Sequence, residues 1–135
     1  MSQLVVGKEI LEQMIAQAKV AEPIEACGIL AGNAGRVEKF YEMTNVDKSS
    51  THFTMEPSEQ FSVMKDARAN GLELLAIYHS HPLTPARPSQ EDIRYALTPG
   101  ATYVILSLKD DEPVIKGFTI ENGTATEVPV EVAEE

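Results

Sequence analysis

The chain has 135 residues, with 11 basic and 21 acidic side chains that give a formal net charge of −10. This length suits one domain with its own hydrophobic core, and the acidic excess argues against nucleic-acid binding, which depends on neutralising phosphates. No apolar run approaches the roughly 18–20 residues of a membrane span, and the single cysteine excludes an internal disulfide and a four-cysteine zinc site.

The first third of the chain predicts a helix and then two antiparallel strands. The opening MSQLVVGKEI lacks the basic region and long apolar stretch of a signal peptide, so we expect a cytoplasmic protein. An amphipathic helical face follows and ends at Pro23; its apolar residues are Ile10, Leu11, Met14, Ile15 and Ala18. The apolar run EACGILAGN, from Glu25, predicts a buried strand with a turn, and RVEKFYEM, from Arg36, predicts the returning strand.

The middle of the chain predicts a polar loop, a second helix and a central strand. The loop is NVDKSSTHFTMEP, and the helix opens at Pro57 and Ser58 and ends at Gly71. Its expected inner side carries Phe61, Met64 and Ala67. The next run, LELLAIY from Leu72, is apolar almost without interruption, which is typical of a strand covered on both faces.

The last third predicts a short helix and three further strands. The helix follows Ser89 and ends at Thr98-Pro99-Gly100, after which TYVILSL predicts a buried strand. EPVIKGFTI and TATEV are predicted to form a hairpin across Asn122-Gly123. The final VPVEVAEE is predicted to be a frayed acidic end. We therefore expect one domain over residues 1–128, an acidic tail over residues 129–135, and a mixed sheet flanked by helices, which is an α/β (α+β) fold.

The segment YHSHPLTPARPSQEDI, residues 78–93, holds the candidate functional residues. On a strand, His79 and His81 point to one face and Ser80 to the other, and Pro82 ends the pairing. Imidazole and carboxylate groups are zinc ligands, so Asp92 is a candidate third ligand. Two simpler interpretations stay open at this point. A His-x-His pair is usually a surface or loop feature, and Ser-x-x-Asp is also typical of a helix N-terminal capping box.

The whole spacing, His-Ser-His-Pro, six residues, then Ser-x-x-Asp, resembles the signature of the JAMM metalloproteases, the catalytic members of the MPN domain family. The upstream glutamate of that family is matched by Glu25 in IEACGIL. The resemblance implies a single MPN/JAMM domain with a deaminase-like architecture. It also implies zinc held by His79, His81 and Asp92, Glu25 as general base, and Ser89 as hydrogen-bond donor to the oxyanion.

The compact length and the run STHFTMEPSEQF resemble the prokaryotic branch with Mec-type sulfur-carrier peptidases. That resemblance implies a metallopeptidase or isopeptidase acting at the C-terminus of a ubiquitin-like or sulfur-carrier protein with a Gly-Gly tail, with release of cysteine and a place in cysteine biosynthesis. A homodimer stays open as the oligomeric state. The alternatives are a general small peptidase and a non-catalytic MPN scaffold. The scaffold is disfavoured because all five functional positions are present.

Other candidates have simpler interpretations. A nucleobase deaminase needs His-x-Glu and Pro-Cys-x-x-Cys, which this chain lacks. Cys27 is expected to be a small buried hydrophobe. His52 is either a solvated loop residue or part of the substrate groove, and Glu22 is discounted as the base because it precedes Pro23, outside the predicted strand.

Overall fold

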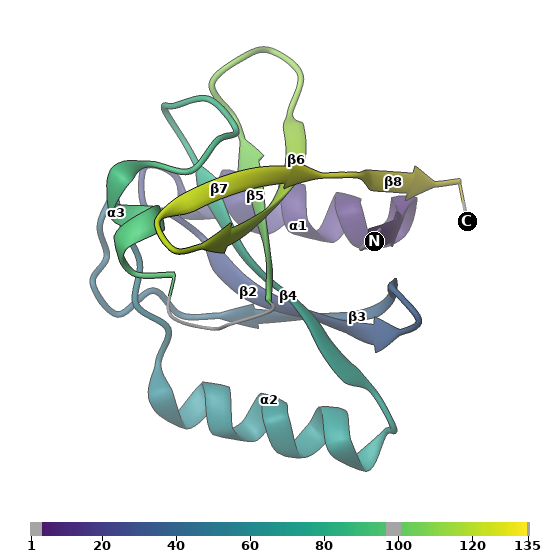
Figure 1. Cartoon of the computed structure of the whole chain (residues 1–135). Coiled ribbons are helices and arrows are strands. Elements are labelled where there is room, and N and C mark those ends of the chain that lie inside the picture. Colours follow the sequence, from purple (N-terminus) through teal and green to yellow (C-terminus); the bar gives the residue numbers. More distant parts are fainter. Residues whose placement is uncertain (1–3, 97–100, 135) are drawn as a thin grey trace.

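One eight-stranded sheet organises the chain in the computed structural model, which describes residues 4–96 and 101–134. The strand order is β7-β6-β5-β4-β2-β3-β1-β8 (Figure 1). In chain order the elements are β1 Leu4–Gly7, α1 Lys8–Ala21, β2 Cys27–Asn33, β3 Arg36–Met43, α2 Pro57–Ala69, β4 Glu73–His81, α3 Gln90–Arg94, β5 Thr102–Ser107, β6 Val114–Glu121, β7 Thr124–Val128 and β8 Val130–Ala133. None of the helices in the described part of the chain is long and apolar enough to span a membrane.

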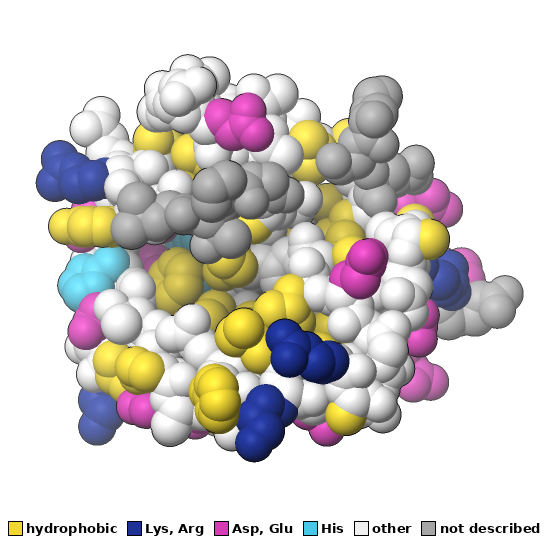
Figure 2. All heavy atoms as spheres, turned by 60° about the horizontal axis from the view of Figure 1, so that its bottom comes forward, with side chains coloured by type: hydrophobic (Ala, Val, Ile, Leu, Met, Phe, Trp, Pro, Cys, Tyr) yellow, Lys and Arg dark blue, Asp and Glu magenta, His cyan; other side chains and the backbone are white. Residues whose placement is uncertain are grey.

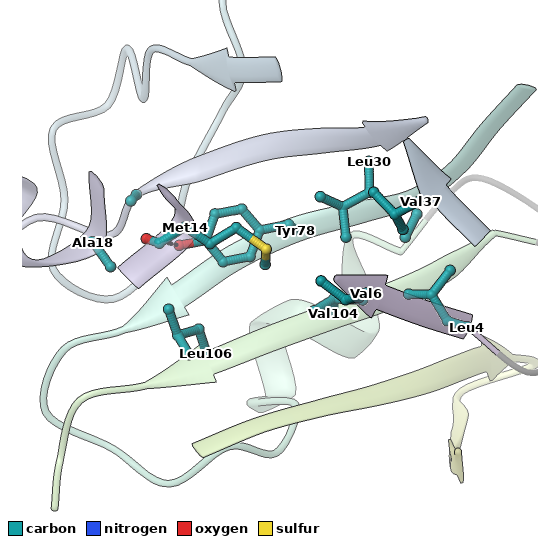
Figure 3. Close-up of a cluster of buried hydrophobic side chains, with 11 residues drawn as sticks. Leu4, Val6, Met14, Ala18, Leu30, Val37, Tyr78, Val104 and Leu106 are labelled. Carbon is teal, nitrogen blue, oxygen red and sulfur yellow. Dashed lines mark hydrogen bonds between the residues drawn. The ribbon is translucent and has the colours of Figure 1, made fainter. Parts of the chain in front are cut away.

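The two long helices cover opposite faces of this sheet. Met14 and Ala18 of α1 pack beside Tyr78 of β4 and the β5 residues Val104 and Leu106, and the Tyr78 hydroxyl donates to the Met14 carbonyl at 3.3 Å (Figure 3). Alternate residues of a strand face opposite ways. The other face of the same strands therefore receives α2.

The cluster under α2 is smaller. Val63 of α2 packs there with Cys27 and Ile29 of β2, and Ile77 of β4 lies against the same group. From Ala76 onward, odd-numbered β4 residues thus face α2 and even-numbered ones face α1. A register shift between Leu74 and Ala76 interrupts the alternation before that point, and Leu75 packs against the core on the α1 side. This alternation decides on which side of the sheet the two histidines at the end of β4 lie.

The mixed sheet flanked by helices agrees with the sequence-based expectation, and several local predictions hold. β4 and β5 are parallel, β2 is antiparallel to both β3 and β4, and β6 and β7 form an antiparallel hairpin. Asn122 and Gly123 both have positive φ, 52° and 77°, which is the backbone of a two-residue hairpin turn.

The expectation of a frayed C-terminal end is wrong. Val130–Ala133 forms β8, which pairs in parallel with β1, and Val130 packs against the main core. Neither β1 nor β8 was predicted as a strand. Each is four residues long, and the two pair with each other from opposite ends of the chain, which a local pattern does not reveal.

The predicted inner face of α2 is partly wrong. Phe61 and Met64 are 63% and 48% exposed, whereas Val63 and Ala67 are buried. The helix contacts the sheet through these two smaller side chains, one turn apart, which turns the larger ones outward. β4 is also exposed where it begins, since Leu74 is 46% accessible. The short helix α3 ends at Arg94, and its predicted stop at residues 98–100 lies outside the described residues.

Candidate metal centre

Three side chains of the types that bind metals converge where β4 ends. The Nε2 atoms of His79 and His81 lie 3.1 Å apart. Oδ2 of Asp92 lies 3.2 Å from the first and 3.0 Å from the second. All three side chains are almost fully buried, so this cluster is part of the protein interior and not a chance surface contact.

Backbone pairing fixes the two histidines, on both sides of the strand at His79 and on the β5 side at His81. His79 is paired with Cys27 of β2 and with Ile105 of β5, and His81 is paired with Ser107. The intervening Ser80 faces the other way, as its position predicts, and its Oγ accepts a hydrogen bond of 2.8 Å from the Ala26 amide. The same residue therefore separates the histidines and ties β4 to the segment that carries Glu25.

Each imidazole is oriented by a different contact. The Nδ1 of His81 donates to the Pro85 carbonyl at 2.9 Å, which leaves a lone pair on its Nε2. His79 has no hydrogen-bond partner for its Nδ1 among the described residues. Its ring is instead stacked on Phe53, with centroids 4.7 Å apart and planes 24° from parallel.

Asp92 is positioned by the capping box of α3. The Ser89 amide donates to Oδ2 of Asp92 at 2.9 Å, and the Asp92 amide donates to Oγ of Ser89 at 3.0 Å. The capping interpretation and the metal-site interpretation thus describe one arrangement, because the cap directs the carboxylate at the histidines. The Ser89 hydroxyl acts only as an acceptor in this bond, so its proton stays available to another partner.

In the absence of a metal, electrostatics favour the metal-binding protonation state of His79 and Asp92 and oppose that of His81. Burial lowers the pKa of His79, which favours the neutral imidazole that a metal needs. Burial acts to raise the pKa of Asp92, but hydrogen bonds from both histidines outweigh it, and the pKa lies well below its ordinary value. Burial also opposes protonation of His81, yet its bonds to Asp92 and the Pro85 carbonyl raise its pKa overall.

Glu25 is the fourth ionisable group of this region. Its side chain is 3% exposed, and its Oε1 has no hydrogen-bond partner among the described residues. Burial raises its pKa to about 8, with His81 opposing and Asp92 adding to the rise. A carboxyl group held this far above its ordinary pKa beside two charged neighbours is typical of a functional site.

The donor set fits a zinc ion. Two donor atoms about 2.0–2.1 Å from a tetrahedral zinc lie roughly 3.3 Å apart, and the three separations observed here are close to that value. Two imidazoles and one carboxylate are also a ligand set typical of catalytic zinc, which leaves a fourth position open.

A pocket of about 210 Å³ adjoins the cluster on the α2 face of the sheet. Its lining includes His79 and Asp92, with Phe53, Ile77 and Tyr95 on its apolar side. Figure 2 shows apolar side chains on the floor of a hollow on this face and a histidine at its left rim. His52 lines this pocket and its side chain is 41% exposed on its loop, so its position agrees with both of its predicted roles.

The remaining sequence candidates stay outside the cluster. Cys27 is fully buried, and burial raises the pKa of its thiol to about 12, which agrees with a small hydrophobe. Glu22 is exposed and follows the last residue of α1. The roles of Phe53, Ser80 and the buried Asn45 do not follow from the sequence, because stacking on His79 and the bonds to Ala26 and Glu25 join residues far apart along the chain.

Known proteins resemble this chain over nearly its whole length. Residues 7–120 match a family described as prokaryotic homologs of the JAB domain. A CysO-cysteine peptidase of Mycobacterium tuberculosis is 36% identical over 135 residues, which cover 98% of this chain and 92% of that protein. A probable TtuB-protein conjugate cleaving protease of Thermus thermophilus is 38% identical over 94 residues, 69% of this chain and 63% of that protein. The solution structure of protein DSY2949 from Desulfitobacterium hafniense superposes with a TM-score of 0.90 at 42% identity, covering 98% of this chain and 94% of that one.

Proposed function

Because the chain belongs to the family of prokaryotic JAB-domain homologs, we propose that it is a zinc-dependent peptidase acting on the C-terminal tail of a ubiquitin-like or sulfur-carrier protein. The family, the fold and the JAMM-type hydrolase class predicted from the sequence are confirmed. The observation that carries the proposal is the convergence of His79, His81 and Asp92 at the end of β4, with a pocket beside them.

His79, His81 and Asp92 would hold the zinc ion. When bound, zinc supplies a positive charge that polarises a carbonyl group and activates water. The protein's own contribution is to present three fixed donors and to leave one side of the site facing the pocket.

Glu25 would be the general base. Its pKa of about 8 lies near neutrality, where a carboxyl group both takes up and returns a proton efficiently. In the proposed reaction its carboxylate takes a proton from the attacking water and delivers it to the nitrogen of the leaving amine. Its burial excludes competing water, and this strengthens the electrostatic contribution.

Ser89 would stabilise the developing oxyanion. Its Oγ accepts from the Asp92 amide, and its hydroxyl proton is then free to donate to the substrate oxygen. The capping bond holds the oxygen in place, so this donor is oriented before the substrate arrives.

The route of the substrate tail follows from the pairing of β4. Both edges of this strand are occupied at His79, so a peptide does not add to the sheet there. The open side is the pocket on the α2 face, and we propose that an extended tail enters through it. Small residues such as a Gly-Gly pair suit passage beside the buried histidines.

The names of three relatives narrow the proposed class of substrate. One relative is named a CysO-cysteine peptidase, one a probable protease of TtuB-protein conjugates, and a third, from Pyrococcus furiosus, a desampylase. We propose a Gly-Gly tail on the carrier and, when the residue beyond it is cysteine, release of that cysteine for cysteine biosynthesis. The cytoplasmic location and the homodimer stay predictions.

The test is cleavage of a purified sulfur-carrier protein that ends in Gly-Gly and is extended by one cysteine. Intact-mass spectrometry should show a loss of that one residue, and a zinc chelator should prevent the loss. An intact carrier together with rapid cleavage of unrelated short peptides would favour a general small peptidase. No cleavage of any substrate by the zinc-loaded chain would favour the scaffold.

A further inference from the structure

Asn45 is a buried polar side chain that the proposed reaction leaves without a role. It lies just after β3 in the loop that leads to α2, and it is 7% exposed although most of that loop is polar and accessible. A buried amide is costly unless its hydrogen bonds are made. The hydrogen-bond partners of Asn45 therefore indicate its role.

Both ends of the Asn45 amide are bonded. Its Nδ2 donates to the carbonyl of Glu25 and to the carbonyl of His52, both at 3.1 Å. Its Oδ1 accepts from the amides of Asp47 at 3.1 Å and Thr54 at 3.2 Å. One side chain thus fastens the loop over residues 47–54 to itself and to the backbone of Glu25.

The position of the Glu25 carboxyl depends on such backbone bonds. Its Oε1 makes no hydrogen bond to a described residue, so no side-chain partner at that oxygen sets its direction. The backbone around it is held from the loop and from β4. The Glu25 amide donates to the Ser49 carbonyl at 2.8 Å, Asn45 donates to the Glu25 carbonyl, and the adjacent Ala26 amide donates to Ser80.

The same loop also contacts the metal centre from the pocket side. Phe53 lies between His52 and Thr54, two of the loop residues whose backbones Asn45 binds, and its ring stacks on His79. The Asn45 amide therefore holds two neighbours of the centre in place. One is the backbone of Glu25, and the other is the loop whose aromatic ring stacks on His79.

We propose that Asn45 is a positioning residue that holds the Glu25 backbone and the Phe53 loop in register with the zinc ligands. It contacts neither the ligand atoms nor the pocket in which the substrate is proposed to bind, so it acts through Glu25 and Phe53. This role rests on the proposed peptidase function, and it predicts damage to turnover without loss of metal.

The central experiment compares Asn45→Ala with Asn45→Asp. The alanine variant removes every hydrogen bond of the side-chain amide. The aspartate variant keeps an acceptor for the amides of Asp47 and Thr54 but loses the donor to Glu25 and His52. Val37→Ala, in the core on the α1 face, is the control for a general loss of stability, and Asn33→Asp, at the exposed end of β2, is the control for added charge.

Two readouts are needed. Amide hydrogen exchange by NMR, on the zinc-loaded and zinc-free protein, should show faster exchange of the Glu25 and Thr54 amides in Asn45→Ala. In Asn45→Asp the Thr54 amide should stay protected while Glu25 exchanges faster. Zinc content should stay near one equivalent in both variants, and kcat should fall by about tenfold or more with KM changed less, since small misplacements of catalytic groups reduce turnover strongly.

The proposal would be overturned if both Asn45 variants kept the wild-type kcat per folded molecule. It would also be overturned if Val37→Ala, at the same stability as the Asn45 variants, lost as much kcat as they do. Unchanged protection of the Glu25 amide would overturn it as well. The exchange measurement needs no substrate, so it tests whether Asn45 anchors the Glu25 backbone even if the wild-type chain cleaves no carrier. A failure of the wild-type chain to cleave would count against the proposed function alone.

Discussion

The two sides of the candidate centre are built in different ways. His79 and His81 stand on β4, which is paired on both edges at His79 and with β5 at His81, so the backbone ladder of the sheet sets their positions. Glu25 lies just before β2 begins, and its backbone is held by single hydrogen bonds from a loop and from Ser80. The metal-binding side should therefore tolerate changes in the loop, whereas the proton-transfer side should be sensitive to them.

Removing a ligand from the sheet side should have the largest effect. His81→Ala leaves two protein ligands, which make a weak site, so bound zinc should fall well below one equivalent and cleavage should be lost. Metal analysis after gel filtration measures this directly. His52→Ala is the matched control, because this half-exposed histidine also lines the pocket but lies outside the ligand cluster. Full zinc occupancy in His81→Ala would contradict the assignment.

Replacing Glu25, the proposed base on the other side, should lower turnover without loss of bound zinc. Glu25→Gln keeps the shape of the side chain but cannot take up the proton, so kcat should fall by roughly 10²–10⁴-fold while zinc stays bound. Glu22→Gln, at an exposed position three residues earlier, should behave as the wild type does. If Glu25→Gln lost its zinc, Glu25 would be a ligand and not the base.

Ser89 caps α3 and bonds the proposed ligand Asp92, and its two roles predict different losses. As the cap of α3 alone, Ser89→Ala should cost about 1 kcal/mol of stability and leave the turnover of folded molecules intact. As an oxyanion donor it should also lower kcat by about 10²-fold. We expect both losses. Steady-state kinetics with a urea unfolding curve distinguishes them, and Ser62→Ala in α2 is the control.

The smallest expected effect is a pH dependence of stability in the zinc-free protein. The folded chain raises the pKa of Glu25 from 4.5 to about 8, so the folded state holds this proton more tightly than the unfolded state. Its contribution to stability is complete below about pH 4.5 and is lost as the pH rises through about 8. Urea unfolding of the wild type and Glu25→Gln at pH 5 and pH 9 should show the wild type losing more stability. Parallel behaviour of the two proteins would contradict the raised pKa.

The sheet side of the centre could be predicted from the sequence because its signals are local. Alternation along a strand places His79 and His81 on one face, and the Ser-x-x-Asp spacing is a helix start whose carboxylate returns toward the strand. The structure brings these residues together at about 3 Å. Local geometry agrees with this convergence, whereas the assignment of the three residues as zinc ligands follows from the resemblance of the whole spacing to the JAMM signature.

The other side could not be predicted in the same way. Asn45 is one polar residue in a polar loop, and the bond that joins this loop to the centre reaches Glu25, 20 residues away. The strands β1 and β8 were missed for the same reason, since they pair across the length of the chain. In α2 the apolar residues Phe61 and Met64 suggested the wrong inner face, because packing against the sheet selected the smaller Val63 and Ala67.

The most direct test of the difference between the metal-binding side and the proton-transfer side is to locate the metal. Anomalous diffraction at the zinc edge from crystals of the zinc-loaded protein should place one ion per chain at about 2.0–2.2 Å from Nε2 of His79, Nε2 of His81 and a carboxylate oxygen of Asp92. The carboxyl of Glu25 should lie nearby without contacting the ion. An ion bound at another site, or bound directly by Glu25, would contradict the account.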